Sequence, residues 1–206
     1  NLLCITSDIK KKFVKILSIL LLIGLSLSQE LGEISFGDHY SLDIATWNIE
    51  WFPKNGQTTL NHVSDIIRNL DLDIVAIQEV DDTVMFDIMV GDLQDYSGYY
   101  ESAWFAGLAY VYKTGLIEIN DIYEIFTTSP YWNALPRSPM VMDINFMGHN
   151  YYLINNHLKC CGDGFLDTSD ASDEENRRFI AMSLLKQYID DNPVSYTHLR
   201  AHETDY

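Results

Sequence analysis

Residues 72–80, LDIVAIQEV, constrain the fold more than any other segment of the chain. They contain a short, continuous apolar run at 74–77, which predicts a strand with both faces covered. Before it lies a stretch with apolar residues at helical spacing, namely Leu60, Val63, Ile66, Ile67 and Leu70. Earlier still, residues 42–48 alternate between two faces and predict a strand that ends near Asn48. A strand, a helix and a second strand in this order indicate a parallel crossover unit.

The rest of the chain adds more strands than helices. A second helix is predicted over 83–93, and β-rich segments follow at 99–105, 107–119 and 138–148. A hairpin turn at 148–150 is expected to lead into the strand 151–156. Because 47% of the residues are apolar, the chain can form a sizeable core. We therefore predict a layered α/β sandwich with two mixed β-sheets flanked by helices.

A last helix is predicted to begin at Ser172, which fits a capping box with Glu175. Its buried stripe is expected to consist of Phe179, Met182, Leu185, Tyr188 and Ile189. Arg177 and Arg178 are expected on a face of this helix, with Glu174 as their local partner.

The start of the chain reads as a leader. Lysines at positions 10, 11, 12 and 15 precede an apolar run at 16–27, and Ser26 and Ser28 have the spacing that a signal peptidase reads. We expect residues 1–28 to be upstream residues and a signal peptide, and the protein to be secreted or periplasmic. It would then meet a membrane only during export. The alternative is a membrane anchor, but a span needs about 20 apolar residues and this run is shorter.

The last residues look foreign to the domain. VSYTHLRAHET, residues 194–204, resembles one reading frame of a sequencing adapter. We therefore expect 194–206 to be an adapter translation, and the domain to occupy 29–193. His198 and His202 have the spacing of a helical metal pair, but an adapter origin gives them no functional weight.

Three predicted strands end in polar side chains: Asn48, Glu79, and Asn156 with His157. In layered α/β folds, active sites gather at one edge, outside the strand ends. A carboxylate and amide oxygens suit a hard divalent cation such as Mg²⁺, and a nearby imidazole can handle a proton. Together they indicate metal-assisted attack of water on a phosphate ester. Taken singly, Glu79 reads as an ordinary loop carboxylate, Asn48 as a turn cap and His157 as a structural histidine.

The charge of the chain restricts its partners. A formal net charge of −17 argues against a protein that coats nucleic acid through bulk electrostatics. It does not exclude an enzyme that meets a phosphate through a bound cation, because the cation supplies the local positive charge.

Four segments in order, ATWNIEWF, DIVAIQEV, RSPMVMDI and INNHLK, resemble the endonuclease/exonuclease/phosphatase superfamily over residues 42–193. That group includes deoxyribonuclease I, exonuclease III, sphingomyelinases and inositol polyphosphate 5-phosphatases. The resemblance implies a deoxyribonuclease I-like fold. It also implies that Glu79 binds the metal, with Asn48 beside it, that His157 contacts the scissile phosphate, with Asn156 next to it, and that Arg137 lies near the phosphate.

The chain also departs from the superfamily pattern. Glu50 stands where the nucleases often carry a basic residue, and Leu108 stands where some members have a phosphate-binding tyrosine. The Gly-Asp-x-Asn and Ser-Asp-His motifs do not occur in the 206 residues. The resemblance therefore implies an incomplete second half of the fold, and a fragment that is inactive by itself.

For the intact parent protein, the resemblance implies a secreted, Mg²⁺-dependent phosphodiesterase or nuclease, with Mn²⁺ or Ca²⁺ as alternative cations. The substrate would be a phosphoester, with DNA and RNA among the candidates, and no stable protein partner is inferred. Two alternatives stay open. One is a phosphomonoesterase or sphingomyelinase-like lipid hydrolase, and the other is a non-catalytic binding domain on the same fold.

The cysteines give one further indication. Cys160 and Cys161 are adjacent, just after the histidine strand, and export permits disulfides. They pair either with cysteines of a missing segment or with each other in a vicinal bridge. A thiolate zinc site would need more ligands at short spacing. The aspartates in the following loop, Asp163, Asp167, Asp170 and Asp173, fit a solvated acidic loop better than a calcium site.

Overall fold

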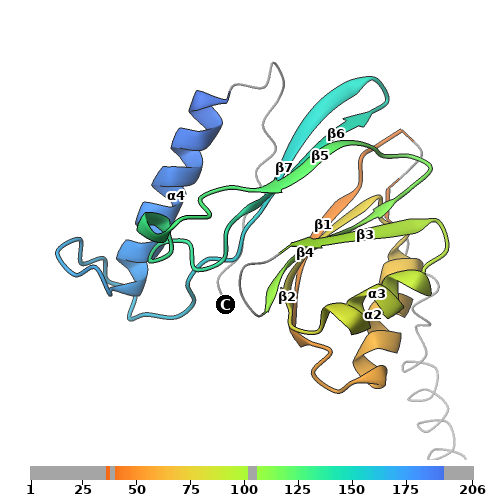
Figure 1. The fold of residues 1–206 in the computed structure, drawn as a ribbon, viewed down its shortest axis with the longest axis horizontal. Coiled ribbons are helices and arrows are strands. Elements are labelled where there is room, and N and C mark those ends of the chain that lie inside the picture. Colours follow the sequence, from red (N-terminus) through yellow and green to blue (C-terminus); the bar gives the residue numbers. More distant parts are fainter. Residues whose placement is uncertain (1–35, 38–39, 102–105, 193–206) are drawn as a thin grey trace, which may run out of the picture. The chain divides into compact units, whose positions relative to one another are not determined.

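The computed structural model describes residues 36–37, 40–101 and 106–192 (Figure 1). The chain divides into two units, Asn1–Ser35 and Phe36–Tyr206, and every described residue belongs to the second. The expected leader and the adapter-like residues 194–206 lie outside the described residues. Within the described part of the chain, no helix is long and apolar enough to cross a membrane.

The first sheet contains the predicted crossover. Its strands are β1 (Ile44–Phe52), β2 (Ile74–Val80), β3 (Tyr96–Glu101) and β4 (Gly107–Lys113), in the order β1-β2-β4-β3. β1 and β2 pair in parallel and are joined by α2 (Gln57–Leu70), which confirms the crossover unit. β4 runs antiparallel to both of its neighbours. α3 (Thr83–Gly91) begins at Asp82, whose side chain accepts a hydrogen bond from the Met85 backbone N–H.

The second sheet has the order β5-β6-β7, and its described strands are all antiparallel. These strands are β5 (Glu118–Glu124), β6 (Met140–Phe146) and β7 (His149–Asn155), with a short 3₁₀ turn, η2 (Ser129–Tyr131), between β5 and β6. The predicted single segment 107–119 is thus two elements, because the chain leaves the first sheet at Lys113 and enters the second at Glu118.

A two-residue hairpin joins β6 to β7. The turn residues are Met147 and Gly148, with φ of 50° and 82°, as a type I′ turn requires. The Asn145 side chain accepts a hydrogen bond from the Gly148 N–H at 3.0 Å. The predicted turn at 148–150 is therefore displaced, because His149 already pairs with Phe146.

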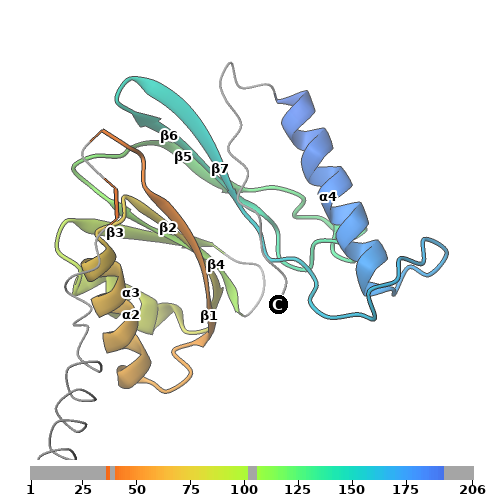
Figure 2. The same cartoon turned by 180° about the vertical axis from the view of Figure 1, so that it is seen from behind.

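Three apolar interfaces stack the elements into layers (Figures 1 and 2). Val75 and Ile77 of β2 face α2 and α3, whereas Ile74 and Ala76 face the second sheet. In the second sheet, the even-numbered residues of β6 pack against the first sheet, and Val141 packs against the last helix with Leu185. The order is helices, sheet, sheet, helix. β2 is apolar throughout because both of its faces are covered.

The last helix, α4 (Glu174–Asp191), differs in detail from the prediction. Its N-cap is Asp173, which accepts from the Asn176 N–H at 2.9 Å, so the Ser172 capping box is wrong. Ala181 and Leu185 are buried, whereas Phe179 and Met182 are 56% and 53% exposed. The buried stripe runs along 181, 185 and 188, because a small side chain at 181 lets the helix approach closely.

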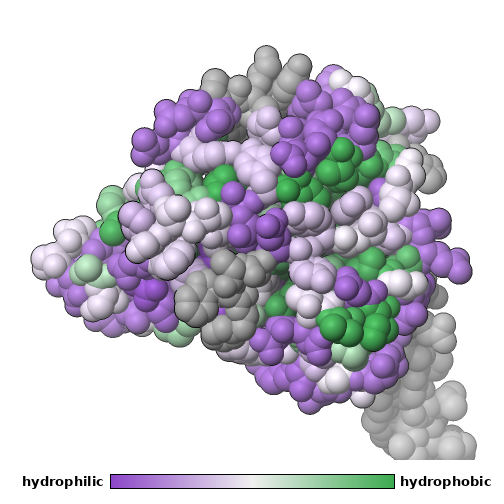
Figure 3. Space-filling model, viewed as in Figure 1, coloured by the Kyte–Doolittle hydropathy of each residue, from purple (hydrophilic) through white to green (hydrophobic). Residues whose placement is uncertain are grey.

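Apolar surface is not confined to α4. On the face shown in Figure 3, polar side chains separate the apolar surface into patches. One patch lies over α3, where Val84 and Ile88 are exposed.

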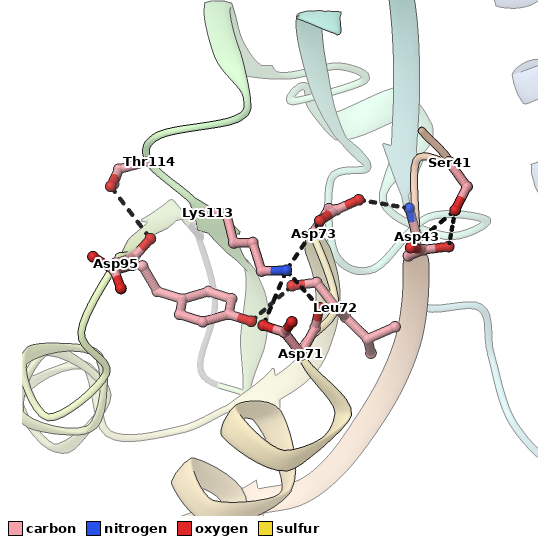
Figure 4. A network of polar contacts seen from close by, with 9 residues as sticks. Ser41, Asp43, Asp71, Leu72, Asp73, Asp95, Lys113 and Thr114 are labelled. Carbon is pink, nitrogen blue, oxygen red and sulfur yellow. Dashed lines mark hydrogen bonds and ion pairs between the residues drawn. The ribbon is translucent and has the colours of Figure 1, made fainter. Parts of the chain in front are cut away.

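A polar network fixes the first sheet at the starts of β1 and β2 (Figure 4). Asp73 is 3% exposed and accepts hydrogen bonds from the Asp43 N–H at 2.9 Å and from the Lys113 ammonium at 3.2 Å. Lys113 also donates to the Asp71 carbonyl at 2.6 Å. Burial lowers the Lys113 pKa, but its bonds to the two carboxylates outweigh burial and leave the pKa raised. The network lies at the sheet end away from Asn48 and Glu79.

Candidate metal and phosphate site

The site begins at an irregularity shared by β1 and β2. The parallel ladder is regular from Ile44 opposite Ile74 to Asn48 opposite Gln78, and it resumes at Phe52 opposite Val80. The strands were predicted to end at Asn48 and Glu79, but both continue past a bulge. In the bulge, Glu50, Trp51 and Glu79 have φ of 45°, 55° and 66°. Residues other than glycine rarely adopt this left-handed region, and such strain is concentrated at functional sites.

The bulge holds the Glu79 carboxylate in one orientation. Its Oε1 accepts a hydrogen bond from Asn48 Nδ2 at 3.0 Å, and its Oε2 accepts one from the Trp51 N–H at 3.1 Å. The Asn48 Oδ1 in turn accepts from the Glu50 N–H at 2.9 Å. Asn48 thus bridges the strained backbone of β1 and the carboxylate of β2, and the Glu79 side chain is 14% exposed.

His157 reaches the same carboxylate from the second sheet. It lies two residues beyond the end of β7, and its Nε2 is 3.5 Å from Glu79 Oε1. Its Nδ1 is buried and has no hydrogen-bond partner among the described residues. Burial lowers the His157 pKa, the Arg137 charge lowers it further, and the Glu79 carboxylate opposes both. Together these effects favour the neutral imidazole.

A buried amide network brings β7 to β2. Asn155 is 3% exposed, and its Oδ1 accepts from Gln78 Nε2 at 2.7 Å. Its Nδ2 donates to the carbonyls of Ile77 at 2.9 Å and Ala109 at 3.0 Å. The Tyr110 hydroxyl accepts from the Asn155 N–H at 2.8 Å. These contacts join the two sheets through Gln78, which precedes Glu79, and through Asn155, two residues before His157.

Gln78, Tyr110 and Asn155 were not among the predicted site residues. The available signal was a glutamine and an asparagine within apolar strands, since polar side chains in such strands need partners. Asn156, which was predicted instead, is half-buried and takes no part in this amide network.

Arg137 completes the group. It is half-buried, precedes β6, and its Nε donates to the Ala106 carbonyl at 3.0 Å. Its charge acts on His157, so it lies near the imidazole. Asn48, Glu79 and His157 therefore come together as predicted, and the charge of Arg137 acts on His157.

The two residues that depart from the superfamily pattern have other roles in this structure. Leu108 is a core residue, 1% exposed, and Glu50 pairs with Lys54 at the surface.

The site presents one oriented carboxylate. Among the described residues, no group of three or more His, Cys, Asp or Glu side chains could hold a metal. A cation at this site would therefore have few protein ligands and keep several waters, as Mg²⁺ commonly does. The Glu79 carboxylate, flanked by the Asn48 amide, would be its ligand.

The sequence model of the Endonuclease/Exonuclease/phosphatase family matches residues 45–187, which is more than half of the chain. The chain belongs to this family. The match includes all four segments that carried the resemblance, and it ends within α4, at residue 187. No curated protein matches the chain in sequence.

Solved structures share the fold of this family member. D. rerio TDP2 complexed with single strand DNA product has a TM-score of 0.58 and 17% identity, over 74% of this chain and 56% of that chain. Truncated Caenorhabditis elegans TDP2 has a TM-score of 0.52 and 20% identity, over 74% and 57%. A family protein from Leptotrichia buccalis C-1013-b has a TM-score of 0.52 and 13% identity, over 75% and 63%.

These similarities confirm the predicted fold class, a sandwich of two sheets flanked by helices. The chain spans about three fifths of the length of the solved structures it matches.

Proposed function

We propose that the protein is a divalent-metal-dependent phosphodiesterase with Mg²⁺ as its preferred cation. The observation that carries the proposal is the convergence of two sheets on one carboxylate oxygen. Glu79 Oε1 accepts from Asn48 at 3.0 Å and faces His157 Nε2 at 3.5 Å. When bound, such a cation offsets negative charge that develops on a phosphate.

Each protein group has a defined task in this proposal. Glu79 contributes the ligand oxygen, and Asn48 keeps the carboxylate turned toward the site. Burial and the Arg137 charge lower the pKa of His157, which favours the neutral imidazole, and a neutral imidazole can accept a proton at the reacting phosphate. Arg137 uses Nε for the Ala106 carbonyl and has its Nη groups for the phosphate, since guanidinium groups bind phosphate as a fork.

The surface charge and the comparisons bear on the substrate. The net charge of −17 disfavours long duplex DNA as a substrate. D. rerio TDP2 was solved with a single strand DNA product, which supports a single-stranded or short phosphodiester. The acidic surface also supports the second candidate, a phosphomonoesterase or lipid phosphodiesterase with a small head group. We further propose that the protein is exported through the leader described above.

The first test measures divalent-cation binding by the 206-residue chain, by calorimetric titration with Mg²⁺ and Mn²⁺. Glu79→Gln should weaken binding by at least about tenfold, because the ligand loses its charge. Glu50→Gln is the matched control: it is a carboxylate in the same bulge, but it is 68% exposed and pairs with Lys54. Equal affinity in the wild type and the Glu79→Gln variant would defeat the proposal.

The second test is hydrolysis of bis-p-nitrophenyl phosphate and single-stranded DNA. We expect hydrolysis by the intact parent protein and none by this chain alone, because the Gly-Asp-x-Asn and Ser-Asp-His motifs are absent from its 206 residues. The rate of the parent protein should depend on Mg²⁺, and both EDTA and Glu79→Gln should abolish it. Cation binding by the parent protein without hydrolysis of any phosphoester would favour the non-catalytic binding domain. Release of phosphate from monoesters alone would favour the phosphomonoesterase.

A further inference from the structure

Two thiols lie in contact just beyond His157. Cys160 and Cys161 are exposed and free, and the Cys161 S–H donates to Cys160 Sγ across 2.8 Å. The Lys159 ammonium lies 4.0 Å from Cys160 Sγ. The pair belongs to the loop between β7 and α4, which runs beside the first turn of α4 (Figure 1). Nothing in the candidate metal and phosphate site uses these thiols.

One arginine of α4 holds the loop on both sides of Cys160. Arg178 Nη1 donates to the Lys159 carbonyl at 2.9 Å and to the Cys161 carbonyl at 2.7 Å. Its Nη2 pairs with Glu175 Oε1 at 3.0 Å, and that oxygen also accepts from the Gly164 N–H at 2.7 Å. We call these contacts the Arg178 clamp. The predicted Glu174 partner is therefore wrong, because Glu175 lies one helical turn before Arg178.

The clamp also shapes the backbone at the thiols. One guanidinium nitrogen binds the two carbonyls that flank Cys160, and Cys161 in the same turn adopts φ of 72° in the left-handed region. The turn brings both sulfur atoms to one side of the loop, where solvent reaches them. Within the clamp, the Glu175 side chain is 13% exposed and the Arg178 side chain 31% exposed.

We propose that Cys160 and Cys161 form a redox-modification site, in which the dithiol converts reversibly to a vicinal disulfide and thereby releases the Arg178 clamp. The oxidant is a low-molecular-weight disulfide. The Cys160 thiolate attacks one of its sulfur atoms, which forms a mixed disulfide and expels the first thiolate. The Cys161 thiolate then attacks Cys160 Sγ, closes the ring and expels the second thiolate. The two thiol protons leave with the two expelled thiols, and the protein loses two electrons.

The order of attack follows from the contact between the thiols. The hydrogen bond to Cys160, together with the charge of Cys160, raises the Cys161 pKa. The raised pKa disfavours the Cys161 thiolate, so the first attack is assigned to Cys160, whose Sγ the Lys159 ammonium approaches.

The geometry favours a switch over a structural bond. Adjacent Cα atoms are about 3.8 Å apart, whereas disulfides usually join Cα atoms about 4.4–6.8 Å apart. The ring is therefore strained and easily reduced. It also closes almost no loop, so it adds little to stability by restricting the unfolded chain. A zinc site is excluded for the described residues, because no third ligand lies in reach.

Intact mass measurement on the full chain tests the chemistry. The reference chain is Cys4→Ser, because the third thiol would form a glutathione adduct of its own. With oxidised glutathione, this chain should lose two hydrogens and stop reacting with iodoacetamide at 160 and 161; reduced glutathione should restore both thiols. Adding Cys160→Ser or Cys161→Ser to it should instead leave a single glutathione adduct. A Cys4→Ser chain that stays a dithiol, or that carries glutathione on both remaining cysteines, would overturn the proposal.

Hydrogen exchange tests the release of the clamp without any assay of activity. Amides of residues 162–166, including the Gly164 N–H bonded to Glu175, should exchange faster in the oxidised chain than in the reduced chain. Arg178→Gln should show the fast exchange already when reduced, while amides of β2 should be unchanged. Equal exchange in the reduced and oxidised forms of the wild type would refute the coupling between the disulfide and the clamp.

Discussion

Asn155 is expected to be the side chain on which the union of the two sheets depends most. Asn155→Ala removes three buried hydrogen bonds, of 2.7 Å to Gln78 and of 2.9 and 3.0 Å to the Ile77 and Ala109 carbonyls. At about 1 kcal/mol for each net hydrogen bond, the variant should lose about 3 kcal/mol of unfolding free energy. Gln78 keeps its bonds to Thr46 and Ala76, so it adds no unpaired donor to this cost.

Urea denaturation followed by tryptophan fluorescence measures this loss, with Asn156→Ala as the matched control. The two asparagines are neighbours, but Asn156 is half-buried and outside the amide network, so its truncation should cost less than about 0.5 kcal/mol. The slope of free energy against urea should be the same in both variants, which would show that the denatured state is unchanged.

Asn155→Ala should also loosen the contact between His157 Nε2 and Glu79 Oε1, because β7 loses its hydrogen bonds to β2. Equal unfolding free energies for the Asn155→Ala and Asn156→Ala variants would refute the reasoning that the network joins the sheets.

Three further predictions follow from the same contacts. Asn48→Ala should weaken Mn²⁺ affinity about tenfold in a titration, because Glu79 loses the amide that orients it; unchanged affinity would contradict that role. Lys113→Met should lower the unfolding free energy by about 2–4 kcal/mol in urea, because the buried Asp73 carboxylate loses its cationic partner, and a change below about 0.5 kcal/mol would contradict this. Burial, and then a nearby carboxylate, raise the pKa of Glu124 from 4.5 to about 7. The folded state thus binds this proton more tightly, so wild-type stability should fall relative to Glu124→Gln as pH rises from 4.5 to 7, and parallel pH profiles would refute this.

The residues of the site were predictable because each stands where an apolar strand meets a polar group. Asn48, Glu79 and His157 are far apart in the chain, yet strand ends of a layered fold gather at one edge. The bulge was not predictable in the same way. Glu50, Trp51 and Glu79 adopt positive φ without a glycine to announce it, and their contacts with each other hold them there.

Other differences arise from packing between elements that are distant in sequence. For α4, the largest apolar residues were predicted to be buried. The buried residues are instead Ala181 and Leu185, because these contact the 134–135 segment and β6. The role of Asn155 depends on which strands of the two sheets face each other, and periodicity within one strand does not carry that information.

The proposed function requires one cation to bind at Glu79 beside His157. Nuclear magnetic resonance of the histidine ring protons during addition of Mn²⁺ tests it directly, because broadening by this paramagnetic ion falls steeply with distance. His157 should broaden before His62, which lies on the exposed side of α2, and the difference should survive in Glu50→Gln and vanish in Glu79→Gln. Equal broadening of both histidines in the wild type, or the same selective broadening in Glu79→Gln, would contradict the account.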